Sequence, residues 1–235
     1  MKLTTFLLWF CLIWQPTTET YQLADCNVLL ESISGTYEGD CKKGQAHGSG
    51  KAVGTDTYDG EFKKGYPHGE GTYTWANGDV YKGEFSKGMM DGQGTMTKTD
   101  GTPPLVGYWI ENEFIGSEKT PYKVVNKSVS INRISFKRLA KTPNEIEFKY
   151  TRLSKPTKAR SLNLQGAFGV LLNENDFSQT VKIHEFPFQG GVSFAALANR
   201  DAGGSGGGEY IDGNFEFSLN LSGKWEVTVE MQGAD

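Results

Sequence analysis

The residues of this sequence that could take part in chemistry are two of its histidines and one serine. His47 and His68 each precede a glycine in similar local sequences. A shared zinc ion would need both imidazole nitrogens at about 2.1 Å, but equivalent positions of successive hairpins lie two strand spacings apart, about 9.6 Å. Ser205 completes a Gly-x-Ser-x-Gly motif within a glycine run, whereas a hydrolase nucleophile needs a strand before this motif and a helix after it. We therefore predict no catalytic residue, no bound metal, no cofactor and no small-molecule substrate; a hydrolase is the least favoured function.

The N-terminus has the pattern of a secretory signal peptide. One positive charge is followed by nine apolar residues, Phe6 to Trp14, which suits an apolar stretch of about 7–15 residues. The run is too short to span a bilayer, which takes about 20 residues. We expect residues 1–20 to be removed and the mature protein to be extracytoplasmic, either periplasmic or secreted. Cys26 and Cys41 then remain. In an oxidising compartment they could form a disulfide, while two buried free thiols agree equally well with the sequence.

The composition excludes one class of partner and indicates a repeat. The chain has 235 residues, 22% of them charged, with a formal net charge of −4 and a pI near 5.5. A nucleic-acid binder would need a basic surface, so we predict no nucleic-acid partner. Of the 30 glycines, 18 fall within residues 35–116. This concentration favours a glycine-containing repeat over general disorder.

Four glycines recur at fixed intervals from residue 39 onward. The intervals are 5, 4 and 2 residues in each of three successive units. A fourth unit has Asn112 at one glycine position, and Asn tolerates a positive φ better than most residues. The pattern therefore predicts tandem strands and turns. The glycines of the first three units are Gly39, Gly44, Gly48 and Gly50; Gly60, Gly65, Gly69 and Gly71; and Gly83, Gly88, Gly92 and Gly94.

Aromatic side chains repeat in phase with these glycines. Tyr58 and Tyr81 lie two residues before the first glycine of their units, and Phe62 and Phe85 lie two residues after it. Residues at i, i+2 and i+4 of a strand share one face, so each unit places two rings and a glycine together. The glycine leaves room for a neighbouring ring over the backbone. Asn77-Gly78 is a strong hairpin signal, so we predict a hairpin turn there.

This unit resembles the membrane occupation and recognition nexus (MORN) repeat. The resemblance is carried by residues 58–78, YDGEFKKGYPHGEGTYTWANG, and extends over residues 37–116. Cys41 replaces the aromatic residue of the first unit, and Leu105 replaces the tyrosine of the last, as is common in the capping units of a stack. The resemblance implies an elongated antiparallel sheet of stacked hairpins. It also implies a role in protein interaction and scaffolding, with some members associated with membranes or lipids.

The composition changes near residue 117, where we place a domain boundary. Residues 21–117 carry 8 basic and 14 acidic side chains, whereas residues 118–235 carry 15 and 13. The second half alternates apolar and polar residues in several short stretches, which is typical of a β-sandwich. We therefore predict an all-β protein. Its expected segments are a signal peptide (1–20), a short N-terminal segment (21–35), repeats (36–117, with units 37–57, 58–80, 81–104 and 105–116) and a β-sandwich (118–235).

The favoured function is that of a secreted, non-enzymatic binding or scaffold protein with a protein partner. A sheet of hairpins cannot cover both of its faces, so we expect part of its aromatic row to bind that partner. The alternative is association with an anionic membrane surface through residues 133–160, which hold nine basic and two acidic residues. The residues of the aromatic row are Tyr58, Phe62, Tyr73, Trp75, Tyr81, Phe85 and Trp109.

Overall fold

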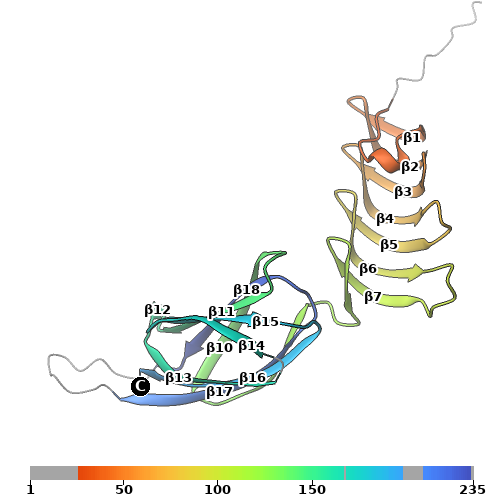
Figure 1. Cartoon of the computed structure of the whole chain (residues 1–235). Coiled ribbons are helices and arrows are strands. Elements are labelled where there is room, and N and C mark those ends of the chain that lie inside the picture. The colour runs from red at the N-terminus through yellow and green to blue at the C-terminus, as the bar shows by residue number, and fades with distance from the viewer. Residues whose placement is uncertain (1–25, 167, 198–208, 234–235) are drawn as a thin grey trace, which may run out of the picture.

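The computed structural model describes residues 26–166, 168–197 and 209–233, which form an almost entirely β structure in two parts (Figure 1). The first part is one antiparallel sheet whose eight strands pair in chain order, and the second part holds two further sheets. The predicted fold class, a stack of hairpins followed by a β-sandwich, is confirmed. The predicted signal peptide and Ser205 lie outside the described residues. Within the described ranges, no helix has the length and apolarity needed to cross a bilayer.

The repeat sheet is built from four hairpins whose strands join at tight turns. Lys64 and Gly65, which separate β3 from β4, have φ values of 54° and 80°. Two consecutive positive φ angles define the type I′ turn favoured in two-residue hairpins. The strands are β1 (Thr36–Lys42), β2 (Gln45–Val53), β3 (Thr57–Lys63), β4 (Tyr66–Thr74), β5 (Val80–Ser86), β6 (Met89–Thr97), β7 (Leu105–Ile110) and β8 (Glu113–Gly116).

The turn predicted at Asn77-Gly78 is present between the antiparallel strands β4 and β5, and the structure adds two details of the turns. Asn77 and Gly78 lie in a five-residue connection between β4 and β5, closed by a hydrogen bond from Trp75 N to Asp79 O (3.0 Å). The two-residue turns lie at Lys-Gly pairs such as Lys64-Gly65 in the first three hairpins and at Glu111-Asn112 in the fourth. In the fourth unit Asn112 has a φ of 72°. Asparagine therefore takes over the positive φ that glycine supplies in the other units.

Seven glycines form a continuous row across the repeat sheet. Gly60 pairs with Gly50 on one side and with Gly71 on the other, and the row ends at Gly39 and Gly107. A Cβ on Gly60 would lie 2.5 Å from the Cα of Gly71 and 2.7 Å from the Oη of Tyr58. The row thus lets paired backbones approach closely while a tyrosine ring covers them.

The sandwich consists of two sheets that share one core. The first has the order β10-β18-β11-β15-β14, with β12 paired to β11, and the second has the order β13-β16-β17-β9. Neighbouring β11 and β18 run parallel, and the other pairs are antiparallel. The strands are β9 (Tyr122–Lys127), β10 (Ile131–Ala140), β11 (Glu145–Arg152), β12 (Lys155–Pro156), β13 (Ala159–Gly166), β14 (Phe168–Glu174), β15 (Ser178–Ile183), β16 (Phe188–Leu197), β17 (Tyr210–Leu219) and β18 (Lys224–Met231).

The alternating residues of the second half line the core of this sandwich. Phe148 of β11 and Phe217 of β17 come from opposite sheets, are both fully buried and have ring centroids 6.2 Å apart. On β18, Val227 and Val229 are fully buried, whereas the residues that alternate with them along the strand are only partly buried. The period-2 pattern therefore assigns the inner face of each strand, as expected for sheets covered on one side.

The last hairpin of the repeat sheet packs against the sandwich. Trp109 of β7 lies in the core of the repeat sheet, while its neighbours Tyr108 and Ile110 pack against the core of the sandwich. Ile115 of β8 is itself part of the sandwich core, and its carbonyl oxygen accepts a hydrogen bond from Asn220 Nδ2 (3.1 Å). The fourth hairpin therefore belongs to both parts of the molecule.

Candidate interaction surfaces

Six of the seven aromatic residues expected to bind a partner form the core of the repeat sheet. Each of the six is at most 6% exposed, and Trp75 is partly buried and packs against them. This corrects the expectation that part of the row is an exposed binding surface. The rings cover one another because those of neighbouring units meet edge to face, as in Tyr58–Phe85 and Tyr81–Trp109, with centroids 5.1 and 5.4 Å apart.

The tyrosine hydroxyls of the row are also used inside the sheet. Tyr58 Oη donates to Glu61 O at 3.0 Å, and Tyr81 Oη donates to Glu84 O at 3.2 Å. Burial, followed by nearby carboxylates, raises the pKa of both phenols above the ordinary value. Burial and the hydrogen bond with Asp56 raise the pKa of Tyr73 to about 12. These phenols stay protonated near neutral pH, so they hold the backbone together and supply no general base.

The N-terminal segment, residues 26–35, covers the inner face of the first two hairpins. Cys26 and Cys41 form a disulfide, which ties the start of this segment to β1. Leu29 N then donates to Gly65 O at 2.8 Å. Ile33, in the short 3-10 helix η1 (Glu31–Ile33), is fully buried in the repeat core. No role was predicted for this segment, although its apolar residues Val28, Leu30 and Ile33 indicate that it packs on a sheet.

Carboxylates next to the glycine row also have structural partners. Glu84 Oε1 accepts a hydrogen bond from Gln93 N at 3.0 Å, and Asp40 Oδ2 accepts one from Ser49 N at 3.2 Å. The carboxylate of Glu61 lies where a Cβ on Gly69 would be. Part of the acidic character of the repeats therefore serves the fold. In the described ranges, no three His, Cys, Asp or Glu side chains come together as metal ligands.

The outer face of the repeat sheet, opposite the rings, carries an exposed row of mixed charge. Glu38, Lys51, Asp59 and Lys82 are exposed, and among the described residues none of them has an ion-pair partner. Cross-strand pairing puts them in one line across the sheet. This line, which we name the outer row, consists of Glu38, Lys51, Asp59, Thr72, Lys82, Thr95 and Val106.

The basic residues of the segment 133–160 are largely neutralised by acidic neighbours from elsewhere in the chain. Five of the nine form ion pairs within the described residues, and Arg160 lies over the ring of Tyr210 at 3.6 Å. The hydrogen bond with Glu226 also raises the pKa of Lys149. These counterions reduce the local excess of positive charge that was counted along the sequence. The ion pairs are Arg133–Glu230 (3.3 Å), Arg138–Glu113 (3.1 Å), Lys141–Glu111 (3.0 Å), Lys149–Glu226 (2.6 Å) and Lys158–Asp176 (2.7 Å).

Comparison with known proteins identifies the first sheet. The family model of the MORN repeat matches residues 37–56, 58–80 and 81–102. These matches cover β1 to β6, with one hairpin in each. No curated protein matches the chain in sequence. Residues 37–102 are therefore three consecutive MORN repeats.

Proposed function

We propose that this is a secreted, non-enzymatic binding protein whose repeat sheet docks a protein partner on its outer row. MORN repeats are commonly involved in protein and membrane interactions and are generally non-catalytic. The observation that carries the proposal is the exposed, unpaired line of alternating charge formed by Glu38, Lys51, Asp59 and Lys82. Repeat proteins bind partners on such extended regular surfaces. The buried rings pack on the opposite face of the sheet and leave the outer row free for contact.

The sign of these charges favours a protein over a membrane. An anionic bilayer attracts surfaces of a single, positive sign, whereas the outer row carries both signs. A protein surface can match both signs and so fix the register of the contact. The ion pairs of the segment 133–160 also weaken the membrane alternative, because paired lysines and arginines attract anionic lipid less strongly. We expect the affinity for the partner to fall with salt, since exposed charges are screened over about 10 Å at 0.1 M.

The disulfide supports an extracytoplasmic location. Disulfides persist in oxidising compartments and are rare in the cytosol. Cys26 and Cys41 tie the entry of the chain to the edge strand β1 of the sheet. N-terminal sequencing of protein made in its native host tests the location. A mature chain that begins between residues 19 and 25 supports it, and intact Met1 in the cytosol contradicts it.

The partner is tested with a charge-swapped outer row in the full chain. The variant Lys51→Glu/Asp59→Lys/Lys82→Glu alters the row without touching the rings. Lys137→Glu, on an exposed position of β10, changes the net charge equally and serves as the control. Wild type and control should capture the same protein from an envelope extract, while the swapped variant loses it. The proposal is overturned if the swapped variant captures it equally, or if the wild type captures no protein and floats with anionic liposomes.

A further inference from the structure

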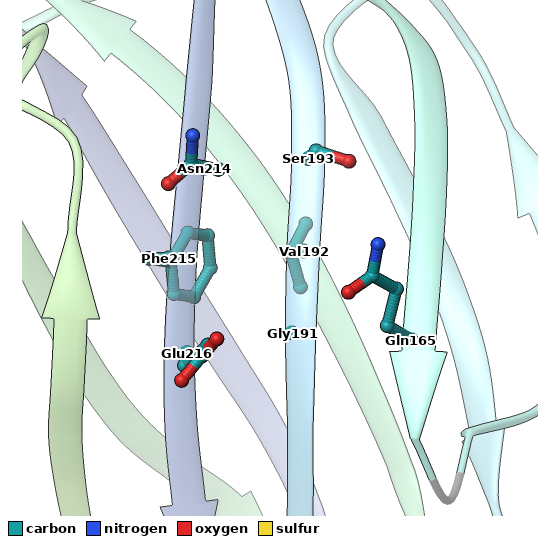
Figure 2. Close-up of a pocket in the computed structure, with 7 residues that line it drawn as sticks. All are labelled: Gln165, Gly191, Val192, Ser193, Asn214, Phe215 and Glu216. Carbon is teal, nitrogen blue, oxygen red and sulfur yellow. The ribbon is translucent and has the colours of Figure 1, made fainter.

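The outer face of the sheet β13-β16-β17-β9 has a shallow depression at its centre. Its volume is about 300 Å³, and its lining residues come from three neighbouring strands (Figure 2). Val192 and Phe215 belong to the buried core beneath it, at 2% and 1% exposure. The volume is at the lower end of the range for ligand pockets, about 300–1,000 Å³. The residues that surround the opening are Gln165, Gly191, Ser193, Asn214 and Glu216.

Gly191 forms the floor of this depression, and the fold does not require a glycine there. Its φ is not in the positive region. A Cβ would meet nothing closer than the Cγ of Glu216 at 3.6 Å and the side chain of Gln165 at 3.7 Å, which is ordinary contact. Gly60, by contrast, has a paired backbone 2.5 Å from the same position. Because glycine inside a strand costs about 0.5–1 kcal/mol relative to alanine, Gly191 leaves a hollow at the expense of stability.

The polar side chains around the hollow have no partners within the described chain. Gln165, Ser193, Asn214 and Glu216 make no side-chain hydrogen bond, and Glu216 makes no ion pair. The pairing register places them in two adjacent rows, Gln165–Gly191–Glu216 and Asn163–Ser193–Asn214. The lining residues together offer two amides, a hydroxyl and a carboxylate around the hollow.

The outer face of the opposite sheet shows that this arrangement is not general to the sandwich. There Lys149 pairs with Glu226 at 2.6 Å, and Arg133 pairs with Glu230 at 3.3 Å. A second depression of about 210 Å³ on that face is lined partly by the Arg133–Glu230 pair and by Thr228. Charges there satisfy one another, whereas the groups around Gly191 remain available to a ligand.

The side chains that line the hollow indicate which class of ligand it can bind. Glu216 is the one charged residue of the lining and disfavours anions. A single carboxylate is a poor site for Ca²⁺, which takes 6–8 oxygen ligands and usually several carboxylates. Amides and hydroxyls can each donate and accept, and a carboxylate accepts from two neighbouring hydroxyls. We propose that the hollow over Gly191 binds a sugar residue of a neutral saccharide, with Gln165, Ser193, Asn214 and Glu216 hydrogen-bonded to its hydroxyls.

The test measures binding of neutral oligosaccharides to the full chain by NMR. The probes are tetrasaccharides built from glucose, galactose, mannose or N-acetylglucosamine, with a sulfated tetrasaccharide as the anionic control. At least one neutral probe should shift the amide signals of β16 and β17 around Gly191, and the shifts should persist in EDTA. The proposal is overturned if no neutral probe does so, or if only the sulfated probe binds.

Two variants separate binding from folding. Gly191→Val fills the hollow at a site with room for a Cβ, so we expect at least a tenfold loss of saccharide affinity with an unchanged or higher melting temperature. Thr228→Val makes a matched change beside the depression of the opposite sheet and should leave the affinity unchanged. Equal affinity of Gly191→Val and wild type would place the saccharide elsewhere and refute the site. The outcome is independent of the outer row of the repeat sheet.

Discussion

The repeat sheet and the sandwich both bury aromatic rings, but they cover them in different ways. In the repeat sheet, each ring is covered by rings one or two strands away in the sequence, as in Tyr58–Phe85. In the sandwich, the covering layer is a second sheet, and the central pair β11–β18 joins residues 77 positions apart, such as Lys149 and Glu226. The comparison teaches that a tandem repeat can build a core from local contacts, whereas the sandwich depends on distant pairings.

The largest expected effect is that of a valine in the glycine row of the repeat sheet. Gly83→Val places a Cβ 2.5 Å from the Cα of Gly94. Since backbone atoms cannot move away without breaking the strand pairing, we expect a loss of more than about 4 kcal/mol in the free energy of unfolding of the repeat sheet. Gly191→Val in the sandwich is the matched control and should cost nothing. Chemical denaturation of both variants measures the difference, and equal midpoints would refute the close-approach account.

The second effect concerns the disulfide, which occurs in the repeat part. Cys26 and Cys41 close a loop with a sequence separation of 15, and such a loop stabilises by about 3 kcal/mol through the entropy of the unfolded chain. In Cys26→Ser/Cys41→Ser, amides of β1 to β4 should exchange faster with solvent deuterium. Amides of the sandwich should exchange at the wild-type rate. Equal acceleration in both parts would mean that the two parts unfold as one unit.

A smaller effect contrasts two buried tyrosines. Tyr81 Oη donates a hydrogen bond to Glu84 O, so Tyr81→Phe should lower the free energy of unfolding by about 1 kcal/mol. Tyr150, in the sandwich core, is buried, and its hydroxyl has no hydrogen-bond partner within the described residues. Tyr150→Phe should therefore leave the stability unchanged or raise it by about 1 kcal/mol, because it removes an unsatisfied polar group. Thermal denaturation should show opposite signs, and a loss of stability in Tyr150→Phe would contradict the reasoning.

The smallest effect is a pH dependence of the repeat sheet. Burial, and then the charges of Glu111 and Glu84, raise the pKa of Asp91 above its ordinary value. A raised pKa means that the folded state favours the protonated acid. The stability that protonation gives to the folded state is therefore fully present below the ordinary pKa and is lost as the pH rises through the raised pKa. Asp91→Asn should thus stabilise the protein by a few tenths of a kcal/mol at pH 7, a small effect because the carboxyl is only partly buried and solvent screens it. The gain should vanish in acid, and a gain that persists there would rule out this cause.

Local features of the repeat sheet could be predicted from the sequence, because the backbone requirements recur. The glycine intervals gave the hairpins, and Asn112 keeps the positive φ expected of it. The lysine at positive φ in these turns, as at Lys64, was not predicted, because lysine carries no strong turn signal. Some of the rings were expected in the core of the repeats, but the burial of six of the seven was not predicted. It depends on neighbouring units that cover one another and on residues 26–35, neither of which periodicity reveals.

Features that depend on distant strands could not be predicted. The excess of basic residues in 133–160 was counted along the chain, but its counterions Glu226 and Glu230 arrive from β18 through sheet pairing. The hollow over Gly191 is likewise invisible in the sequence. It exists because the register sets Gln165 and Glu216 on either side of that glycine.

The shared hairpin β7–β8 has a mechanical consequence. Successive residues of β7 point into different cores, Trp109 into that of the repeats and Ile110 into that of the sandwich. A bend between the two parts would have to separate Ile110 and Ile115 from the sandwich core or Trp109 from the repeat core. We therefore expect the hairpin β7–β8 to resist bending at the junction.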